Sequence, residues 1–168
     1  RIIDLQDKVI EQKNLKIFLA TGNKHKIEEI SDIFSGIENI EILSIKDGIE
    51  IPEVIEDGTT FEENSKKKAV EIAKFLNMIT IADDSGLCVD ALNGEPGVYS
   101  ARYSGTGDDL KNNEKLIENL KGVENRKAKF VSVITLAKPN GETYSFEGEI
   151  LGEIVDNPRG NTGFFFEF

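Results

Sequence analysis

Apolar residues recur along the chain with two different periods, and the alternation of these periods predicts strands and helices in turn. Short apolar or alternating runs predict strands at residues 16–20, 40–46, 49–55, 78–82, 87–92, 128–137, 142–148 and 150–155. Spacings of three and four residues predict amphipathic helices at residues 1–14, 21–35, 61–77 and 109–121. This order of elements indicates an α/β domain with a mixed sheet.

The apolar stripes of the later helices define the sides that we expect to face the core. They comprise Ile27, Ile30, Ile33 and Phe34, then Phe61, Ala69, Ile72, Ala73 and Leu76, then Leu110, Leu116, Ile117 and Leu120. Thr60 to Glu63 has the pattern of a capping box, and Asp108 is suited to cap the third of these helices. A turn at residues 83–86 is expected to close the strand at 78–82, and one at 139–141 to join a β-hairpin.

Composition and charge exclude several classes of protein. The 31 acidic and 20 basic residues give a net charge of −11, which disfavours a general nucleic-acid binder, because such a protein needs a basic surface. One cysteine excludes a disulfide scaffold, and no apolar run approaches the roughly 18 residues of a membrane span. We therefore expect a single domain in the cytoplasm, without a membrane or polymer partner but with room for a local anion site.

The first candidate site is the junction Thr21, Gly22, Asn23, Lys24, His25 and Lys26. Asn23 is a good N-cap, Gly22 lets a ligand approach the backbone, and the amides of a helix N-terminus favour an anion. Cations are disfavoured in a first helical turn, so Lys24 and Lys26 make sense there if a phosphate docks. An ordinary turn with solvated lysines remains the alternative.

The second candidate is Asp83-Asp84-Ser85-Gly86, at the end of a predicted strand, where open α/β sheets place ligands. Two adjacent carboxylates of an extended chain point to different sides, so one can bind Mg²⁺ while the other braces the loop. A plain turn is the alternative. A third stretch, from Glu56 to Lys68, has an exposed charged helix face as its default interpretation.

Single residues give weaker signals. His25 is the only histidine and lies among lysines, which argues against a Ser-His-Asp triad. Cys88 lies in an apolar run and is expected to pack rather than react, and no cysteine and histidine set supports a zinc site. Arg102 is suited either to a phosphate or to an acidic neighbour.

Four motifs in order give the chain a specific resemblance. They are Phe18-Leu19-Ala20-Thr21-Gly22-Asn23-x-x-Lys26, Thr60-Phe61-x-Glu63-Asn64-x-x-x-Lys68-Ala69, Ala82-Asp83-Asp84-Ser85-Gly86-Leu87 and Gly94-x-Pro96-Gly97-Val98-Tyr99-Ser100-Ala101-Arg102-Tyr103-Ser104-Gly105. Together they resemble the inosine triphosphate pyrophosphatase family, from about Lys16 to Gly163. The resemblance implies a long mixed central sheet flanked by helices, with two lobes and a nucleotide cleft.

The resemblance also implies an activity and roles for individual residues. The activity is Mg²⁺-dependent hydrolysis of ITP, dITP and XTP to the monophosphate and pyrophosphate, by a homodimer. By position, residues 21–26 and Lys68 would hold the triphosphate, Glu56 and Asp84 would bind the metal, and Asp84 would also accept a proton. Ser85 would contact the substrate, and Phe164 matches part of a motif that helps to hold the base.

The two ends of the sequence depart from the family pattern. Phe165, Phe166 and Glu167 replace Gly, Tyr and Asp of the base-binding motif, and a later Ser-His-Arg motif has no counterpart. We therefore expect residues 1–14 to be a helical extension or linker, and residues 15–168 to be the catalytic domain with an incomplete C-terminal end. Two alternatives stay open: a catalytically weak nucleotide-binding domain of a fused protein, and a related pyrophosphatase with another base preference.

Overall fold

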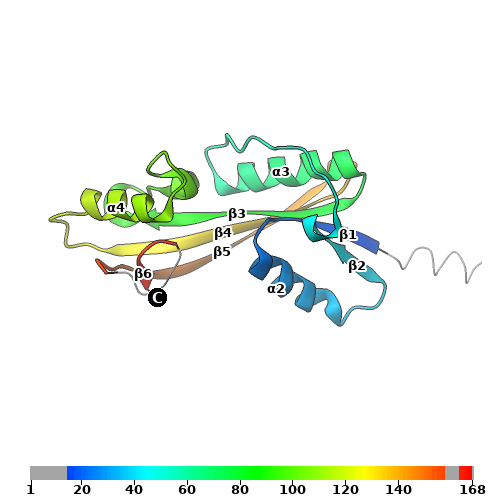
Figure 1. The fold of residues 1–168 in the computed structure, drawn as a ribbon, viewed down its shortest axis with the longest axis horizontal. Helices are drawn as coiled ribbons and strands as arrows, with labels where there is room; N and C mark the ends of the chain where they lie inside the picture. The colour runs from blue at the N-terminus through cyan, green and yellow to red at the C-terminus, as the bar shows by residue number, and fades with distance from the viewer. Residues whose placement is uncertain (1–14, 158–162, 168) are drawn as a thin grey trace, which may run out of the picture. The chain divides into compact units, whose positions relative to one another are not determined.

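The computed structural model describes residues 15–157 and 163–167, so the helix expected at 1–14 lies outside the described residues. Six strands form one sheet in the order β2-β1-β3-β4-β5-β6 (Figure 1). β1 pairs in parallel with β2 and β3, whereas β6 pairs antiparallel with β5, so the predicted mixed sheet is confirmed. The elements are β1 (Leu15–Ala20), α2 (Lys24–Ser35), β2 (Ile40–Leu43), η1 (Ile45–Asp47), α3 (Phe61–Leu76), β3 (Ile79–Val89), η2 (Asp90–Leu92), η3 (Gly97–Arg102), α4 (Asp109–Asn119), β4 (Lys127–Ala137), β5 (Thr143–Ile154) and β6 (Phe166–Glu167).

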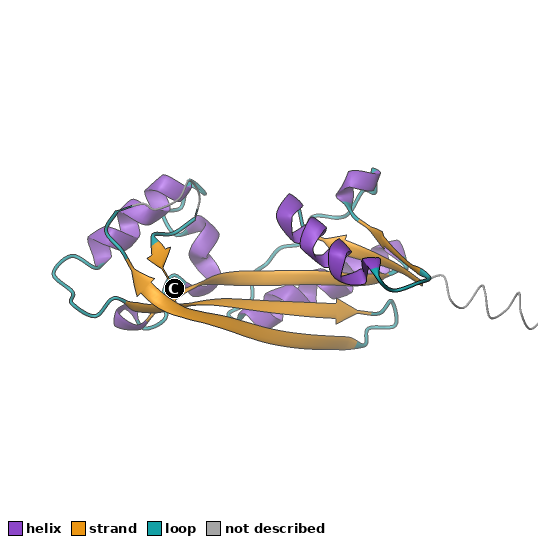
Figure 2. Cartoon of the chain, turned by 90° about the horizontal axis from the view of Figure 1, so that it is seen from below, coloured by secondary structure: helices purple, strands orange, loops and turns teal. Residues whose placement is uncertain are grey.

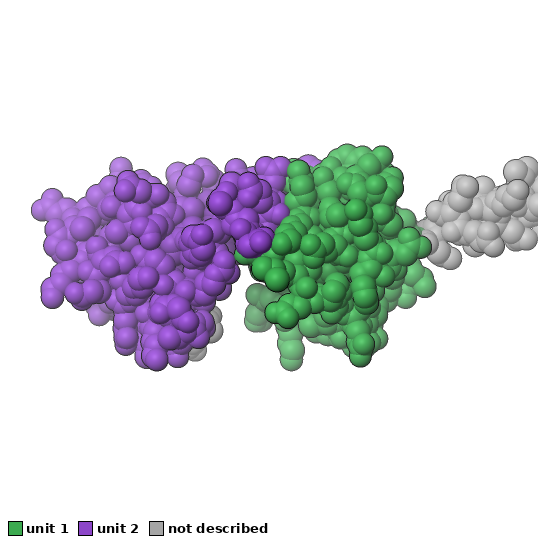
Figure 3. Space-filling view, turned by 90° about the horizontal axis from the view of Figure 1, so that it is seen from above, with its two compact units in different colours: residues 1–56, 65–83, 134–145 green, residues 57–64, 84–133, 146–168 purple. Residues whose placement is uncertain are grey.

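The chain divides into two compact units (Figure 3). Unit 1 comprises residues 1–56, 65–83 and 134–145, and unit 2 comprises residues 57–64, 84–133 and 146–168. The strands β3, β4 and β5 contribute residues to both units. Figure 2 shows the helices and strands of the chain coloured by type. None of the described helices is long and apolar enough to cross a membrane.

Unit 1 has a sheet between two helices, because alternate residues of a strand point to opposite faces. Phe18 and Ala20 of β1 pack with Ala69, Ile72 and Ala73 of α3. The residues that alternate with them, Ile17 and Leu19, belong to a second cluster with Ile27 of α2. The four-residue apolar run at the end of β1 is therefore buried on both faces.

Unit 2 is held by one apolar cluster between α4 and the sheet. Leu87 and Val89 of β3 pack with Leu116 of α4 and with Leu120, the C-cap of that helix, and all four side chains are fully buried. Phe164 and Phe166 pack against the same cluster. Two partly buried side chains of the C-terminal segment therefore pack against the core of unit 2.

The turn predicted at residues 83–86 is wrong, because β3 runs through it without a break. β3 lies between β1 and β4 in the sheet, so neighbouring strands support a run of residues that alone prefers a turn. The predicted strands at 142–148 and 150–155 are likewise one strand, β5. In both places the pairing of long strands overrides local turn preference.

The strand predicted at 49–55 is also wrong, and the strand predicted at 40–46 ends at Leu43. Pro52 has no N–H for a strand ladder, which weakens pairing across this stretch. Ile49, Ile51 and Val54 instead pack against the core cluster that contains α3. Their alternation therefore reflects packing of an irregular segment and not a strand.

Two residues of the predicted apolar stripes are exposed. Ile33 of α2 is 71% exposed, and Leu110 of α4 is 62% exposed. Each lies six residues from a buried residue of its own helix, Ile27 or Leu116, which places it roughly 120° around the helix at about 100° per residue. The other predicted residues of these two stripes do pack in or against the core clusters, so their prediction is confirmed.

Candidate functional site

The predicted anion site lies at the N-terminus of α2. The side chain of Asn23 accepts from the backbone N–H of His25 at 2.9 Å and of Lys26 at 3.4 Å, so the predicted N-cap is confirmed. Thr21 supports the cap, since its hydroxyl accepts from the N–H of Asn23 at 3.2 Å. The first turn of α2 has no acidic residue, and the side chains of Lys24 and His25 are exposed.

Gly22 has no steric reason within the protein to be glycine. A Cβ at this position would meet only Cδ1 of Ile45, at 4.0 Å, which is ordinary contact. The loop would therefore accept a larger residue. Only a ligand that approaches the backbone would require glycine at this position.

Lys26 forms an ion pair with Asp83. The pairing follows from the sheet, because Ala20 of β1 lies opposite Ala82 of β3 in parallel register, and the residues after each then lie at the same edge. The side chain of Asp83 is 14% exposed and that of Lys26 is 35% exposed. Asp83 thus holds the ammonium group of Lys26 in place.

Glu56 and Lys68 also lie beside each other in unit 1. The Nζ of Lys68 on α3 is 3.8 Å from Oε1 of Glu56, and both side chains are partly buried. The predicted metal ligand and the predicted phosphate contact are therefore neighbours. This arrangement is more specific than the solvated helix face that is the default for such a sequence.

Asp84 is held in unit 2 by Asn64. The Nδ2 of Asn64 donates to Oδ2 of Asp84 at 3.2 Å, and Oδ1 of Asn64 accepts from the N–H of Gly58 at 2.7 Å. The side chain of Asn64 is 1% exposed. A Cβ at Gly58 would lie 2.6 Å from Oδ1 of Asn64, so glycine is needed for this chain of hydrogen bonds. The carboxylate of Asp84 therefore has a fixed orientation.

Asp83 and Asp84 have different partners, Lys26 and Asn64, as expected for adjacent residues of an extended chain.

The start of α3 is held by Thr60, whose hydroxyl accepts from the N–H of Glu63 at 3.1 Å. The carboxylate of Glu63 accepts from the N–H of Thr59 at 2.9 Å, one residue earlier than a capping box requires.

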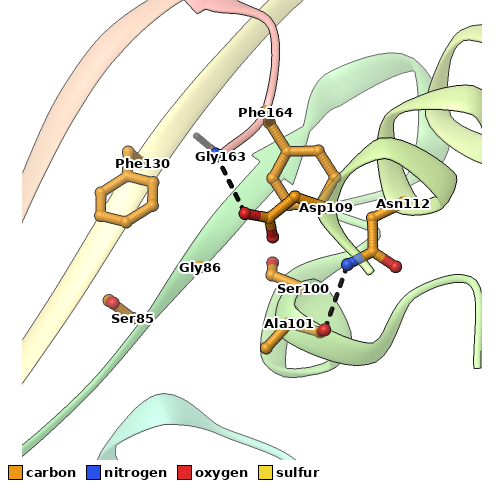
Figure 4. A pocket seen from close by; sticks show the side chains of 9 residues that line it. All are labelled: Ser85, Gly86, Ser100, Ala101, Asp109, Asn112, Phe130, Gly163 and Phe164. Carbon is orange, nitrogen blue, oxygen red and sulfur yellow. Dashed lines mark hydrogen bonds between the residues drawn. The ribbon is translucent and has the colours of Figure 1, made fainter. Parts of the chain in front are cut away.

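A pocket of about 170 Å³ in unit 2 brings together the predicted substrate contacts Ser85 and Phe164 (Figure 4). Phe130 of β4 supplies a second aromatic ring. The remaining lining residues are Gly86, Ser100, Ala101, Asp109, Asn112 and Gly163. Because Ser85 follows Asp84 in β3, the pocket begins one residue after the held carboxylate.

Gly86 is required by the close approach of another segment to β3. A Cβ there would lie 2.4 Å from the carbonyl oxygen of Gly97 and 2.6 Å from Oγ of Ser100. The hydroxyl of Ser100 donates to the carbonyl of Gly97 at 2.7 Å and accepts from the N–H of Leu87 at 2.9 Å. The η3 segment is thereby joined to the strand beneath the pocket.

Two further single residues, Cys88 and Arg102, do not line the pocket beside Ser85. Cys88 is partly buried, and burial raises the pKa of its thiol, which favours the unreactive protonated form. Arg102 stacks on the ring of Tyr99, with its guanidinium carbon 5.3 Å from the ring centre. Across residues 15–157 and 163–167, no group of three or more His, Cys, Asp or Glu side chains is placed to hold a metal.

Sequence reasoning missed the pocket residues Asn112 and Phe130, and it gave no role to Asn64. Asn112 and Asn113 lie in the middle of α4, and Asn64 lies in α3. Asparagine is a poor residue for a helix interior, because its side chain competes for backbone hydrogen bonds. That preference was the available signal, since a buried asparagine in a helix needs a specific partner.

Comparisons with known proteins agree with this fold. A dITP/XTP pyrophosphatase of Listeria innocua is 49% identical to this chain, over 90% of the chain and 76% of that protein. One of Clostridium perfringens is 50% identical, over 90% of the chain and 78% of that protein. The structure of the Ham1 protein of Staphylococcus aureus matches with a TM-score of 0.79 and 44% identity, over 90% of this chain and 78% of that one. The model of the Ham1 family matches residues 17–168, and the chain belongs to this family.

Proposed function

We propose that this protein hydrolyses dITP, XTP and ITP to the nucleoside monophosphate and pyrophosphate, and so removes non-standard purine nucleotides from the nucleotide pool. The observation that carries the proposal is identity at about half of the aligned positions to proteins named dITP/XTP pyrophosphatase. The family match at residues 17–168 spans every residue that we assign to the site.

In the proposed reaction, water attacks the α-phosphorus, the bond to the bridging oxygen breaks, and pyrophosphate leaves. Asp84 accepts the proton of the attacking water, a role for which its carboxylate is oriented by Asn64. Lys26, Lys68 and the amides at the N-terminus of α2 hold the triphosphate and offset the charge that develops on the leaving group. Lys24 and His25 are exposed in the same turn, and the proposal gives them contacts with the same anion.

The proposal includes Mg²⁺, held by Glu56 and Asp84. Both donors are carboxylates, which are the hard oxygen ligands that Mg²⁺ prefers. A set of two protein carboxylates also fits Mg²⁺, because this ion keeps waters and substrate phosphates in its coordination shell. When bound, Mg²⁺ neutralises phosphate charge and polarises the phosphorus centre.

The pocket beside Ser85 is proposed to take the base. Its volume of about 170 Å³ is below the roughly 300–1,000 Å³ of sites that enclose a whole small molecule, so it suits one ring system. The rings of Phe130 and Phe164 offer faces or edges to a flat heterocycle. Ser85 and Ser100 provide polar groups at its wall.

The proposal extends to a homodimer. Phe146 and Ile150 are four positions apart on β5, so their side chains share a face of the strand, and they are 69% and 49% exposed. Exposed apolar side chains that gather on one face are typical of an interaction surface. A mass in solution of twice 18.6 kDa is the corresponding measurement.

The activity is tested by pyrophosphate release from XTP, dITP, ITP, GTP, ATP, dTTP and UTP, with and without Mg²⁺. We expect turnover of the first three, dependent on Mg²⁺, and a loss of kcat of about 10²- to 10⁴-fold in Asp84→Asn. Asp90→Asn is the matched control, because Asp90 is an exposed aspartate just beyond the same strand.

Each outcome of this assay bears on one part of the proposal. Equal turnover of all seven nucleotides contradicts the base preference, and release of inorganic phosphate alone contradicts cleavage at the α-phosphorus. Nucleotide binding without turnover favours a binding domain. Full activity of Asp84→Asn removes the assigned proton acceptor.

A further inference from the structure

The side chain of Asn113 connects α4 to the C-terminal segment that carries Phe164. Its Nδ2 donates to the carbonyl of Gly163 at 2.7 Å, and its Oδ1 accepts from the N–H of Phe165 at 2.9 Å. These two bonds hold the backbone on both sides of Phe164. Asp109, one turn earlier on α4, adds a weaker contact, because its carboxylate accepts from the N–H of Gly163 at 3.4 Å.

Asn112 makes the equivalent connection to the other side of the pocket. Its Nδ2 donates to the carbonyl of Ala101 at 3.1 Å, and its Oδ1 accepts from the N–H of Ser104 at 2.8 Å (Figure 4 shows the first of these bonds). Ala101 lines the pocket, as Phe164 does. Two consecutive side chains of one helix therefore hold two segments that are far apart in the sequence.

Both amides are buried and hydrogen-bonded through their nitrogen and their oxygen. Asn112 is 2% exposed and Asn113 is 3% exposed. The second N–H of Asn113 donates to the carbonyl of Asp109 at 3.1 Å, so its amide makes two donor bonds and one acceptor bond. No other uncharged side chain of this size combines two such donors with an acceptor in the same shape.

We propose that Asn113 is a positioning residue of the base pocket, which fixes the ring of Phe164 through the backbone of Gly163 and Phe165. This role rests on the proposed function, which assigns the pocket to the base. Asn113 does not line the pocket, and it acts through Phe164. Loss of this amide would leave the triphosphate residues of unit 1 in place and would release one wall of the pocket.

The position of the ring can be measured without any activity. The chain has no tryptophan, so Phe164→Trp introduces a single indole into the pocket wall. In this background, Asn113→Asp removes both N–H donors while it keeps the shape of the side chain. We expect a red-shifted indole emission and an acrylamide quenching constant about two- to threefold higher, because the ring is less well held against the core.

Acidification is expected to reverse the change in indole emission if lost hydrogen bonds cause it. A change caused by lost packing would persist at low pH. Protonation of the introduced carboxyl group restores one O–H donor toward the carbonyl of Gly163. We therefore expect the emission of Asn113→Asp to return toward that of the Phe164→Trp reference as the pH falls through the pKa of this group. Asn113→Ala, which has no titratable group there, is expected to keep the red-shifted emission at every pH.

Kinetics separate the base pocket from the phosphate site. In the chain with Phe164 intact, we expect Asn113→Asp to raise the KM for XTP about tenfold, with kcat changed less than about threefold. The inhibition constant of inorganic tripolyphosphate, which has no base, is expected to stay the same. Asn119→Asp is the matched control on the same helix, because Asn119 contacts the hydroxyl of Tyr103 and not the C-terminal segment.

The proposal is overturned if Asn113→Asp leaves both the indole emission and the KM at the values of the reference proteins. It is also overturned if tripolyphosphate inhibition weakens as much as the KM rises, or if Asn119→Asp gives the same changes. If Asn113→Asp does not fold, the same measurements on Asn113→Ser, with a smaller side chain, decide the question. An inactive parent protein with the expected emission changes would contradict the proposed function while supporting the role of Asn113.

Discussion

Asp83 and Asp84 are adjacent in β3, yet their carboxylates contact different groups, Lys26 in one case and Asn64 in the other. The difference arises because successive side chains of a strand point to opposite faces. Ser85 and Gly86 follow at once and line the pocket. Four consecutive residues thus serve four purposes: an ion pair, a held carboxylate, a pocket contact and a close approach of backbone.

Gly86→Ala tests the close approach at the residue scale. The added Cβ would lie 2.4 Å from a backbone oxygen and 2.6 Å from Oγ of Ser100, so the η3 segment has to move. We expect the free energy of unfolding to fall by about 1–3 kcal/mol, the range for overpacking, in urea titrations.

Gly148→Ala is the control for this substitution. Gly148 is a strand glycine of β5 with nothing within 4 Å of an added Cβ. Its substitution is expected to leave stability unchanged or slightly higher, since alanine lowers the entropy of the unfolded chain. Equal losses in the two variants would contradict the steric explanation.

At the scale of the element, α2 combines a good N-cap with an unfavourable charge pattern. Asn23 satisfies two amides, but Lys24 and Lys26 stand at the positive end of the helix dipole with no acidic residue in that turn. Lys26 is offset by Asp83, whereas Lys24 is exposed. A pattern that weakens the free helix is consistent with selection for an anionic ligand.

Lys24→Glu is expected to separate stability from function. The substitution places an anion at the helix N-terminus, which should raise the free energy of unfolding by about 0.3–1 kcal/mol. The same charge should repel the triphosphate and raise the KM for XTP about three- to tenfold at low ionic strength. Urea titration and initial rates measure the two effects.

Lys111→Glu gives the matched charge change in the first turn of α4. Lys111 is exposed and follows the N-cap Asp108, so a similar gain in stability is expected. Its KM should not change, because it does not line the pocket. An equal rise in KM for both variants would indicate a general effect of net charge.

At the scale of the whole molecule, the groups with raised pKa values all lead to the same pH dependence. Burial raises the pKa of Cys88 and of Tyr103 above their ordinary values of 9.0 and 10.0. Lys129 and Lys138 donate hydrogen bonds to the carboxylates of Glu149 and Glu142, which raises the pKa of the two ammonium groups. In each case the native chain binds protons more tightly than the unfolded chain.

The free energy of unfolding should therefore fall as the pH rises above about 9, because the unfolded state then binds fewer protons than the native state. Cys88→Val removes the first of these groups and should make the fall between about pH 9 and about pH 10 shallower. Urea titrations at several pH values measure the slope. A stability that rises over this range would contradict the directions of the four shifts.

Much of the fold could be predicted because periodicity reports burial directly. The strand at β1, the helices α2, α3 and α4, and the caps Asn23 and Asp108 follow from apolar spacing and local hydrogen-bonding chemistry. The four motifs also led to the correct family. The predictions for individual site residues remain to be tested by the experiments above.

The local pattern by itself determined where apolar faces, caps and motif residues lie, because these depend on residues within a few positions of one another. Only the tertiary structure decided that residues 83–86 continue a central strand, that Asn64 holds Asp84, and that Asn113 holds the segment around Phe164. Each of these features joins segments that are distant along the chain. Their stability comes from pairing and buried hydrogen bonds, which no local window of sequence contains.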